Sequence, residues 1–168
     1  MPEELRRRIR RYSHEKGIKQ GYVYSLAHEE YSRNISNEDL IGKVCECDTL
    51  PQLRAYAHLV GEQLGLIRER AKEEYSKGIS DECLIEKLRN ANIHQRLAVY
   101  AALTDKNLTD VISEAEKTYA TTRPFEDLIK KLSADDSRRL EMSAELNNRH
   151  LRDVQAEAVD EFLKKRGY

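Results

Sequence analysis

The densest group of side chains that could bind a charged partner lies between Arg6 and Lys19. Leu5, Ile9 and Tyr12 recur at helical spacing there, so the basic residues surround the outer side of a helix. Guanidinium groups donate hydrogen bonds in a planar fork that matches carboxylates and phosphates. This helix is therefore a candidate docking surface, or alternatively the solvated outer side of a capping helix. The candidate partner-binding residues are Arg6, Arg7, Arg8, Arg10, Arg11, Lys16 and Lys19.

Histidine and cysteine, the usual ligands of transition metals, do not occur at metal-binding spacings in this sequence. His14 and His58 occupy related positions, but packed helices lie about 8–10 Å apart, too far to share one ion. Cys45 and Cys47 are two residues apart, so their side chains diverge on a helix. No segment combines a nucleophile, a base and an oxyanion-binding donor. We therefore expect no metal, no cofactor and no enzymatic activity.

Tyrosine and lysine recur at positions that suggest a shared structural role. Two sets of tyrosines could stack on nucleic-acid bases, but each lies on an apolar helical side, which favours core packing. Lys43 and Lys131 follow Asp39 and Asp127 by four residues, the spacing of helix-surface ion pairs. The recurring residues are Tyr12, Tyr56, Tyr100, Tyr31, Tyr75, Tyr119, Lys43, Lys87 and Lys131.

An internal repeat positions these residues. The stretch EEYSRNISNEDLIGKV at 29–44 returns as EEYSKGISDECLIEKL at 73–88, an offset of 44 residues. Beyond residue 132 an offset of 43 keeps the apolar residues aligned. Periods of 20–50 residues are typical of stacked supersecondary units. The aligned apolar columns include Ile9, Leu53, Leu97 and Leu140, then Ile67, Val111 and Val154, and finally Ala27, Ala71, Ala115 and Ala158.

Each repeat is predicted to contain three helices. A short helix begins near Ser36, Ser80 or Pro124, residues suited to a helix start. Two longer helices follow as a hairpin, and the hairpins lie near 3–34, 49–77, 93–121 and 136–166. The hairpin corners carry residue types that adopt the left-handed backbone conformation most easily, which a helix C-terminus commonly requires. These corner residues are Gly17, Gly61, Asp105 and Asn148.

The predicted fold is all-α, with eleven helices and no sheet. Three to four tandem repeats of about 44 residues form a small α-solenoid-like superhelical stack in which each layer contacts its neighbours. A closed helical bundle made by duplication is the alternative. We expect a single domain over 1–168, with a capping hairpin at 1–35 and repeats at 36–79, 80–123 and 124–168. Its short helices should bury Leu40, Ile41, Leu84, Ile85, Leu128 and Ile129.

Composition narrows the class of partner. The 29 Lys and Arg residues nearly cancel the 30 Asp and Glu residues, which argues against binding nucleic acid through bulk charge. No apolar run reaches the roughly 18 residues of a spanning helix, and residues 1–12 lack the apolar segment of a signal peptide. We therefore expect a cytoplasmic, non-enzymatic repeat protein that binds a protein partner. A nucleic-acid-associated regulator that uses the basic first helix is the alternative.

Overall fold

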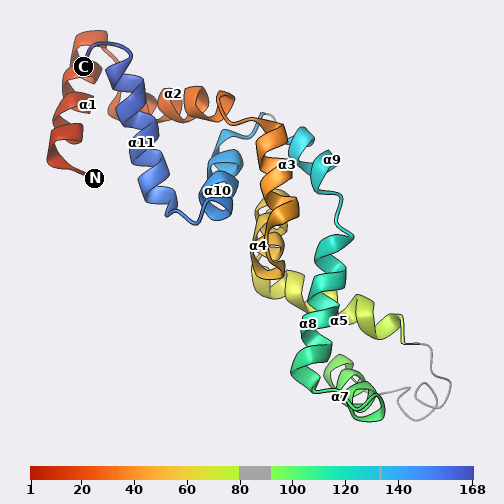
Figure 1. Ribbon diagram of the computed structural model, residues 1–168. Helices are drawn as coiled ribbons and strands as arrows, with labels where there is room; N and C mark the ends of the chain where they lie inside the picture. The colour runs from red at the N-terminus through yellow and green to blue at the C-terminus, as the bar shows by residue number, and fades with distance from the viewer. Residues whose placement is uncertain (80–91, 133) are drawn as a thin grey trace. The chain divides into compact units, whose positions relative to one another are not determined.

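The computed structural model describes residues 1–79, 92–132 and 134–168, and within these ranges α-helices joined by short loops are the only regular secondary structure (Figure 1). This confirms the predicted helical class. The eleventh predicted helix, expected near Ser80, lies outside the described residues. The ten described helices are α1 Glu3–Lys16, α2 Gln20–Arg33, α3 Asn37–Glu46, α4 Thr49–Val60, α5 Leu64–Lys77, α7 Ile93–Leu103, α8 Leu108–Thr121, α9 Phe125–Lys131, α10 Asp136–Leu146 and α11 Leu151–Lys164.

Eight of these helices form four hairpins at the predicted places. We name them hairpin 1 (α1–α2), hairpin 2 (α4–α5), hairpin 3 (α7–α8) and hairpin 4 (α10–α11). Their second helices begin at Gln20, Leu64, Leu108 and Leu151, at successive spacings of 44, 44 and 43 residues. The change of spacing falls where the sequence alignment placed it.

The four hairpin corners share one backbone conformation, as predicted. Gly17 and Gly61 have φ angles of 65° and 69°, and Asp105 and Asn148 have φ angles of 54° and 52°. At each corner the residue that follows donates its amide to a carbonyl five residues back, for example Ile18 to Ser13 at 3.0 Å and Arg149 to Ala144 at 2.8 Å. This bond satisfies one of the carbonyls that a helix end leaves without a partner.

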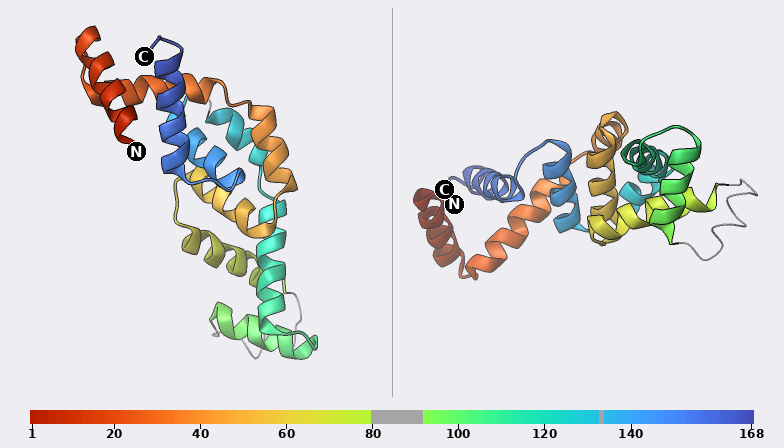
Figure 2. Two further views of the ribbon diagram at one scale, coloured as in Figure 1. Left: turned by 60° about the vertical axis from the view of Figure 1, so that its left-hand side comes forward. Right: turned by 90° about the horizontal axis from the view of Figure 1, so that it is seen from below.

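The described residues divide into two compact units. Unit 1 comprises Met1–Cys47 and Phe125–Tyr168, and unit 2 comprises Asp48–Pro124. In unit 1, hairpin 1 packs on hairpin 4, because α11 crosses α2 and also contacts α1 (Figure 2). In unit 2, hairpin 2 packs on hairpin 3 through α8, which contacts both α4 and α5.

A solenoid-like stack of successive layers is not confirmed by this pairing, since hairpin 1 packs on the last hairpin in the chain and not on the next one. The physical reason is that any two hairpins present the same apolar columns, so the repeat alone does not select a neighbour. The single domain over 1–168 stays a prediction.

The apolar columns form the core of both units. Ile9, Leu53, Leu97 and Leu140 are all at most 1% exposed, and the alanine column from Ala27 to Ala158 is equally buried. In unit 1 the core joins α1, α2 and α11 through Leu5, Ile9, Tyr12, Val23, Ala27, Val159, Phe162 and Leu163. In unit 2 the two clusters centre on Leu53 with Ile67 and on Leu97 with Val111.

The short helices α3 and α9 pack against each other in unit 1. The prediction that both apolar residues of each short helix are buried is only partly correct. Leu40 and Ile129 are buried, whereas Ile41 and Leu128 are only half-buried. Adjacent helical residues point about 100° apart, so one member of each pair reaches the core. Phe125 at the start of α9 adds a buried ring where α3 has the polar Asn37, which rotates the buried side by one residue. Leu84 and Ile85 lie outside the described residues.

Candidate functional site

The outer side of α1 carries two arginines without an intrachain partner. Arg7 and Arg10 are exposed, and within the described ranges neither makes a hydrogen bond or an ion pair. They are three residues apart and therefore neighbours on one helical side. The opposite side of α1 is held in the core of unit 1 by Leu5, Ile9 and Tyr12. The helix thus presents these two guanidinium groups to solvent from an ordered scaffold.

Arg8 has a structural role that the sequence did not indicate. Its Nη1 lies 2.5 Å from Asp160 Oδ1, and its Nε and Nη2 donate to a main-chain oxygen of Tyr168 at 3.0 and 2.8 Å. Together with Lys164, Arg8 holds the pKa of Asp160 below its usual value. Arg8 therefore acts as an intrachain clamp that fastens α1 to the end of α11, and its expected role in docking stays a prediction.

Arg6 and Arg11 are paired with carboxylates of the same helix. Arg6 lies 3.8 Å from Glu3, and Arg11 Nε lies 3.0 Å from Glu15 Oε1. The Tyr168 hydroxyl donates to Glu15 as well, and together with Arg11 it lowers the pKa of Glu15. These exposed pairs are weak in water, but they lower the positive charge that α1 offers to a partner.

Lys16 and Lys19 lie at the corner of hairpin 1. Lys16 is the last residue of α1, and Lys19 is the N-cap residue of α2. Both are exposed. Of the seven predicted residues, Arg7 and Arg10 thus lie along the helix, and the two lysines lie at the corner that follows it.

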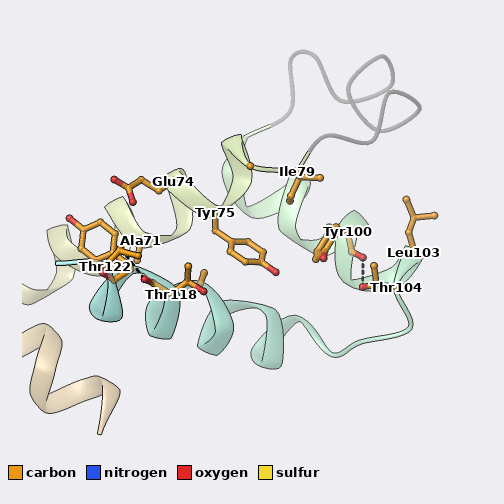
Figure 3. Close-up of a pocket in the computed structure, with 12 residues that line it drawn as sticks. Ala71, Glu74, Tyr75, Ile79, Tyr100, Leu103, Thr104, Thr118 and Thr122 are labelled. Carbon is orange, nitrogen blue, oxygen red and sulfur yellow. Dashed lines mark hydrogen bonds between the residues drawn. The ribbon is translucent and has the colours of Figure 1, made fainter. Parts of the chain in front are cut away.

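A second candidate site is a groove of about 750 Å³ in unit 2, between α5, α7 and α8 (Figure 3). Tyr75 lies between α5 and α8, and its ring meets Tyr100 edge-on at 6.0 Å between centroids. Burial, with Tyr100 and Glu114 nearby, raises the pKa of Tyr75 well above its usual value. The hydroxyl therefore stays protonated and can donate a hydrogen bond, but it cannot act as a base near neutral pH.

The tyrosine columns pack mainly inside the fold, as predicted. Tyr12 and Tyr119 are buried, and the other members are half-buried. Tyr12 meets Phe162 edge-on at 5.5 Å, and Tyr56 meets Tyr119 at 5.9 Å. Such edge-to-face contacts stabilise cores. They leave few open ring faces for stacking on a base.

The lysine column behaves differently in its two described copies. Lys43 lies 3.4 Å from Asp39, which confirms the predicted pair, and Lys43 also reaches Asn147 Oδ1 at 2.5 Å. In α9 the pair forms one residue earlier, between Lys130 and Glu126 at 2.8 Å. The predicted pair of Asp127 with Lys131 is therefore wrong, and Lys87 lies outside the described residues.

His28 is a half-buried histidine that the sequence did not single out. Its Nε2 is buried and has no hydrogen-bond partner among the described residues. Burial lowers the pKa of His28, and the negative charge of Asp136 only partly opposes this effect. The only signal in the sequence was its place on α2, one residue after the buried Ala27.

The described residues contain no cluster of three or more histidine, cysteine, aspartate or glutamate side chains arranged to hold a metal ion. No helix among them is long and apolar enough to cross a membrane. Comparison of the chain with protein-family models, with curated proteins and with solved structures finds no match.

Proposed function

We propose that this protein is a helical-repeat binding module without enzymatic activity, and that it engages a protein partner through the outer side of α1. Arg7 and Arg10 make the principal contacts, and Lys16 and Lys19 extend the positive surface. The single observation that carries the proposal is that these two arginines are exposed on an anchored helix, with no carboxylate of the described residues paired to them.

The tandem repeat is part of the proposal. Matching helix starts, four corners of one conformation and common buried columns support a unit of about 44 residues that recurs along the chain. Repeat proteins of this kind act by presenting surface to a partner. The proposal therefore assigns no catalytic residue, metal or cofactor.

The favoured partner chemistry is an acidic protein segment. Two neighbouring guanidinium forks match two carboxylates on one side of a helix or strand. Nucleic acid is less favoured, because binding to a duplex draws on many phosphate contacts and three of the five arginines on α1 already have intrachain partners. A nucleic-acid-associated regulator is therefore an outcome of the test.

The test compares wild-type protein with the variant Arg7→Gln, Arg10→Gln. The probes are a synthetic peptide rich in glutamate and a double-stranded oligonucleotide, each titrated at two salt concentrations. The peptide should bind wild type and lose about tenfold in affinity in the variant, the effect of roughly 1.4 kcal/mol. The free energy of unfolding should change by less than about 0.5 kcal/mol.

The matched control is Arg33→Gln with Lys77→Gln, which removes two exposed cations from the ends of other helices. It should bind the peptide as wild type does. The proposal would be contradicted if the variant at Arg7 and Arg10 bound the peptide with the same affinity as the wild-type protein. Tight, steeply salt-dependent binding of the oligonucleotide alone would replace it with the nucleic-acid alternative.

A further inference from the structure

The position of Arg8 recurs in the first helix of every hairpin, and the position of Asp160 recurs in every second helix. The inference below rests on the repeat proposed above. The first column contains Arg8, Gln52, Arg96 and Arg139, and the second contains Glu29, Glu73, Lys117 and Asp160. Three of the four hairpins thus have an arginine in the first column and three have a carboxylate in the second.

The arginine column lies at the surface where two hairpins meet. Arg8 of hairpin 1 reaches the end of α11 in hairpin 4. Arg139 of hairpin 4 donates to the carbonyl of Ile35, just beyond α2 in hairpin 1, at 2.5 Å. Arg96 of hairpin 3 donates to the carbonyl of Ser76 in hairpin 2 at 3.2 Å. In each case the arginine bonds to the partner hairpin and satisfies a carbonyl at or near the end of its second helix.

Gln52 and Lys117 are the exceptions, and they belong to hairpins that pair with each other. Helix α4, which carries Gln52, packs on α8, which carries Lys117, just as α1 packs on α11. The one hairpin with a lysine in place of the carboxylate is therefore paired with the one hairpin that has a neutral glutamine in place of the arginine.

Pairing of hairpin 3 with hairpin 1 would place two cations together. Lys117 would then take the place of Asp160 beside Arg8. Like charges at a partly buried interface suppress a wrong pairing. Gln52 avoids this repulsion.

Glu116, the neighbour of Lys117, also favours the pairing of hairpin 3 with hairpin 2, but through a different interaction. Glu116 is 7% exposed and accepts a hydrogen bond from Arg68 Nε of hairpin 2 at 2.7 Å. The positions equivalent to Arg68 hold Tyr24 in hairpin 1 and Gln155 in hairpin 4. Neither side chain carries a positive charge, so pairing with either hairpin would bury a carboxylate without its counterion.

We propose that Glu116 and Lys117 are the specificity determinants of hairpin pairing. They direct hairpin 3 to hairpin 2 and thereby leave hairpins 1 and 4 to pair with each other. The apolar columns supply attraction between any two hairpins, and these two polar residues exclude the wrong combinations.

The test uses the full chain and removes the differences between the two units at the four positions discussed above. A four-site variant gives unit 2 the residues of unit 1 through Gln52→Arg, Lys117→Asp, Arg68→Tyr and Glu116→Val. The denaturation midpoint of the variant should be equal to or higher than that of the wild type. After refolding at high protein concentration it should form several times more oligomer, measured by size exclusion with light scattering, or show additional amide peaks in its NMR spectrum. A single set of peaks and the oligomer fraction of wild type would overturn the proposal.

A second pair of variants tests the repulsion directly. Gln52→Arg alone should lower the denaturation midpoint, because the new guanidinium group would face the ammonium group of Lys117. Adding Lys117→Asp should restore the midpoint. The matched control reverses the exposed pair on α9, through Glu126→Lys with Lys130→Glu, and should lower the midpoint much less, because the reversed pair only opposes the helix dipole. An unchanged midpoint in Gln52→Arg would also overturn the proposal.

Discussion

In each unit, the ends of the second helices of the two paired hairpins meet, and we call this place the hairpin junction. Among the described residues, side chains fill the junction in unit 1, whereas a groove lies at the junction in unit 2. In unit 1 Glu30 accepts hydrogen bonds from Arg166 at 2.9 Å and Lys165 at 3.3 Å, and Arg166 lies over the Phe162 ring at 3.6 Å. In unit 2 the equivalent Glu74 lies 3.3 Å from Arg123. Arg123 in turn lies over the Tyr119 ring at 3.8 Å. The polar scheme of the junction is therefore shared.

The difference lies in the volume of the surrounding side chains. Equivalent positions lining the two junctions hold Asn34, Glu161 and Lys165 in unit 1, and Gly78, Thr118 and Thr122 in unit 2. A smaller residue stands at each of the three positions in unit 2, and the groove of about 750 Å³ is lined by these smaller residues. The open groove thus coincides with the smaller lining residues.

The largest expected effect on the free energy of unfolding comes from the buried leucine that both units have in their cores. Leu53→Ala in unit 2 and Leu140→Ala in unit 1 should each lower the free energy of unfolding by about 2–5 kcal/mol, because both side chains are fully buried. Chemical denaturation measures the loss. The control is Leu103→Ala, whose side chain is 64% exposed, with an expected change below about 0.5 kcal/mol. A loss under about 1 kcal/mol at either core site would show that the two cores are not equivalent.

The hairpin corners should give the next largest effect. Gly61→Ala should destabilise unit 2 by about 1 kcal/mol, because an L-residue is strained at its φ of 69°. Asn148→Gly in unit 1 should instead stabilise by a few tenths of a kcal/mol, because asparagine already tolerates that conformation at a cost. The same denaturation curves measure both changes. Equal signs for the two variants would argue against a common corner.

The shared ion pair should contribute less, and unequally. Replacing Glu30 and Arg166 by glutamine, singly and together, should give a coupling energy of about 0.5–1 kcal/mol. The Glu74 and Arg123 cycle should give about 0–0.5 kcal/mol, because the Glu74 side chain is 57% exposed and Glu30 is 31% exposed. A larger coupling in unit 2 would reverse this ranking and point to a better shielded junction there.

The smallest expected effect is a pH dependence confined to unit 1. Burial lowers the pKa of His28, so the unfolded chain binds a proton at a higher pH than the folded chain does. Stability should therefore fall as pH drops below about 6.5, the ordinary histidine value, until the folded state also becomes protonated. Asp136 from α10 opposes the shift, and Arg152 and Asp153 of α11 line the adjoining cavity.

The measurement compares denaturation midpoints of wild type and His28→Gln between pH 7 and pH 5, about the range in which histidine titrates. The wild type should lose more stability over this range than the variant. The equivalent residue of unit 2 is Lys72, so Lys72→Gln is the control and should follow wild type. Parallel curves for wild type and His28→Gln would remove His28 as the source.

Features that depend on near neighbours in the chain could be predicted from the sequence. Gly17 and Asn148 were assigned a left-handed backbone because a helix end requires it within a few residues. The buried side of each hairpin followed from the spacing of residues such as Ile9 and Leu53. The short helices were harder, because whether Leu40 or Ile41 reaches the core depends on the helix packed against them.

The candidate site also has features that depend on near neighbours in the chain and features that depend on distant contacts. The basic character of α1 is evident in the sequence, and Arg7 with Arg10 remains available. The role of Arg8 was missed because its partner, Asp160, lies 152 residues away. The sequence offers no local signal for such a contact.

By itself, the sequence determined the helical class, the corner conformations and the buried apolar positions, because each follows from local backbone preference and from periodicity. Only the tertiary structure decided that hairpin 1 pairs with hairpin 4, that Arg8 is a clamp, and that a groove opens in unit 2 but not at the matching junction of unit 1. These features arise from contacts between residues far apart in the chain. Four hairpins with similar apolar positions can pair in several ways, and in the observed pairing Arg8 contacts Asp160 and Arg68 contacts Glu116.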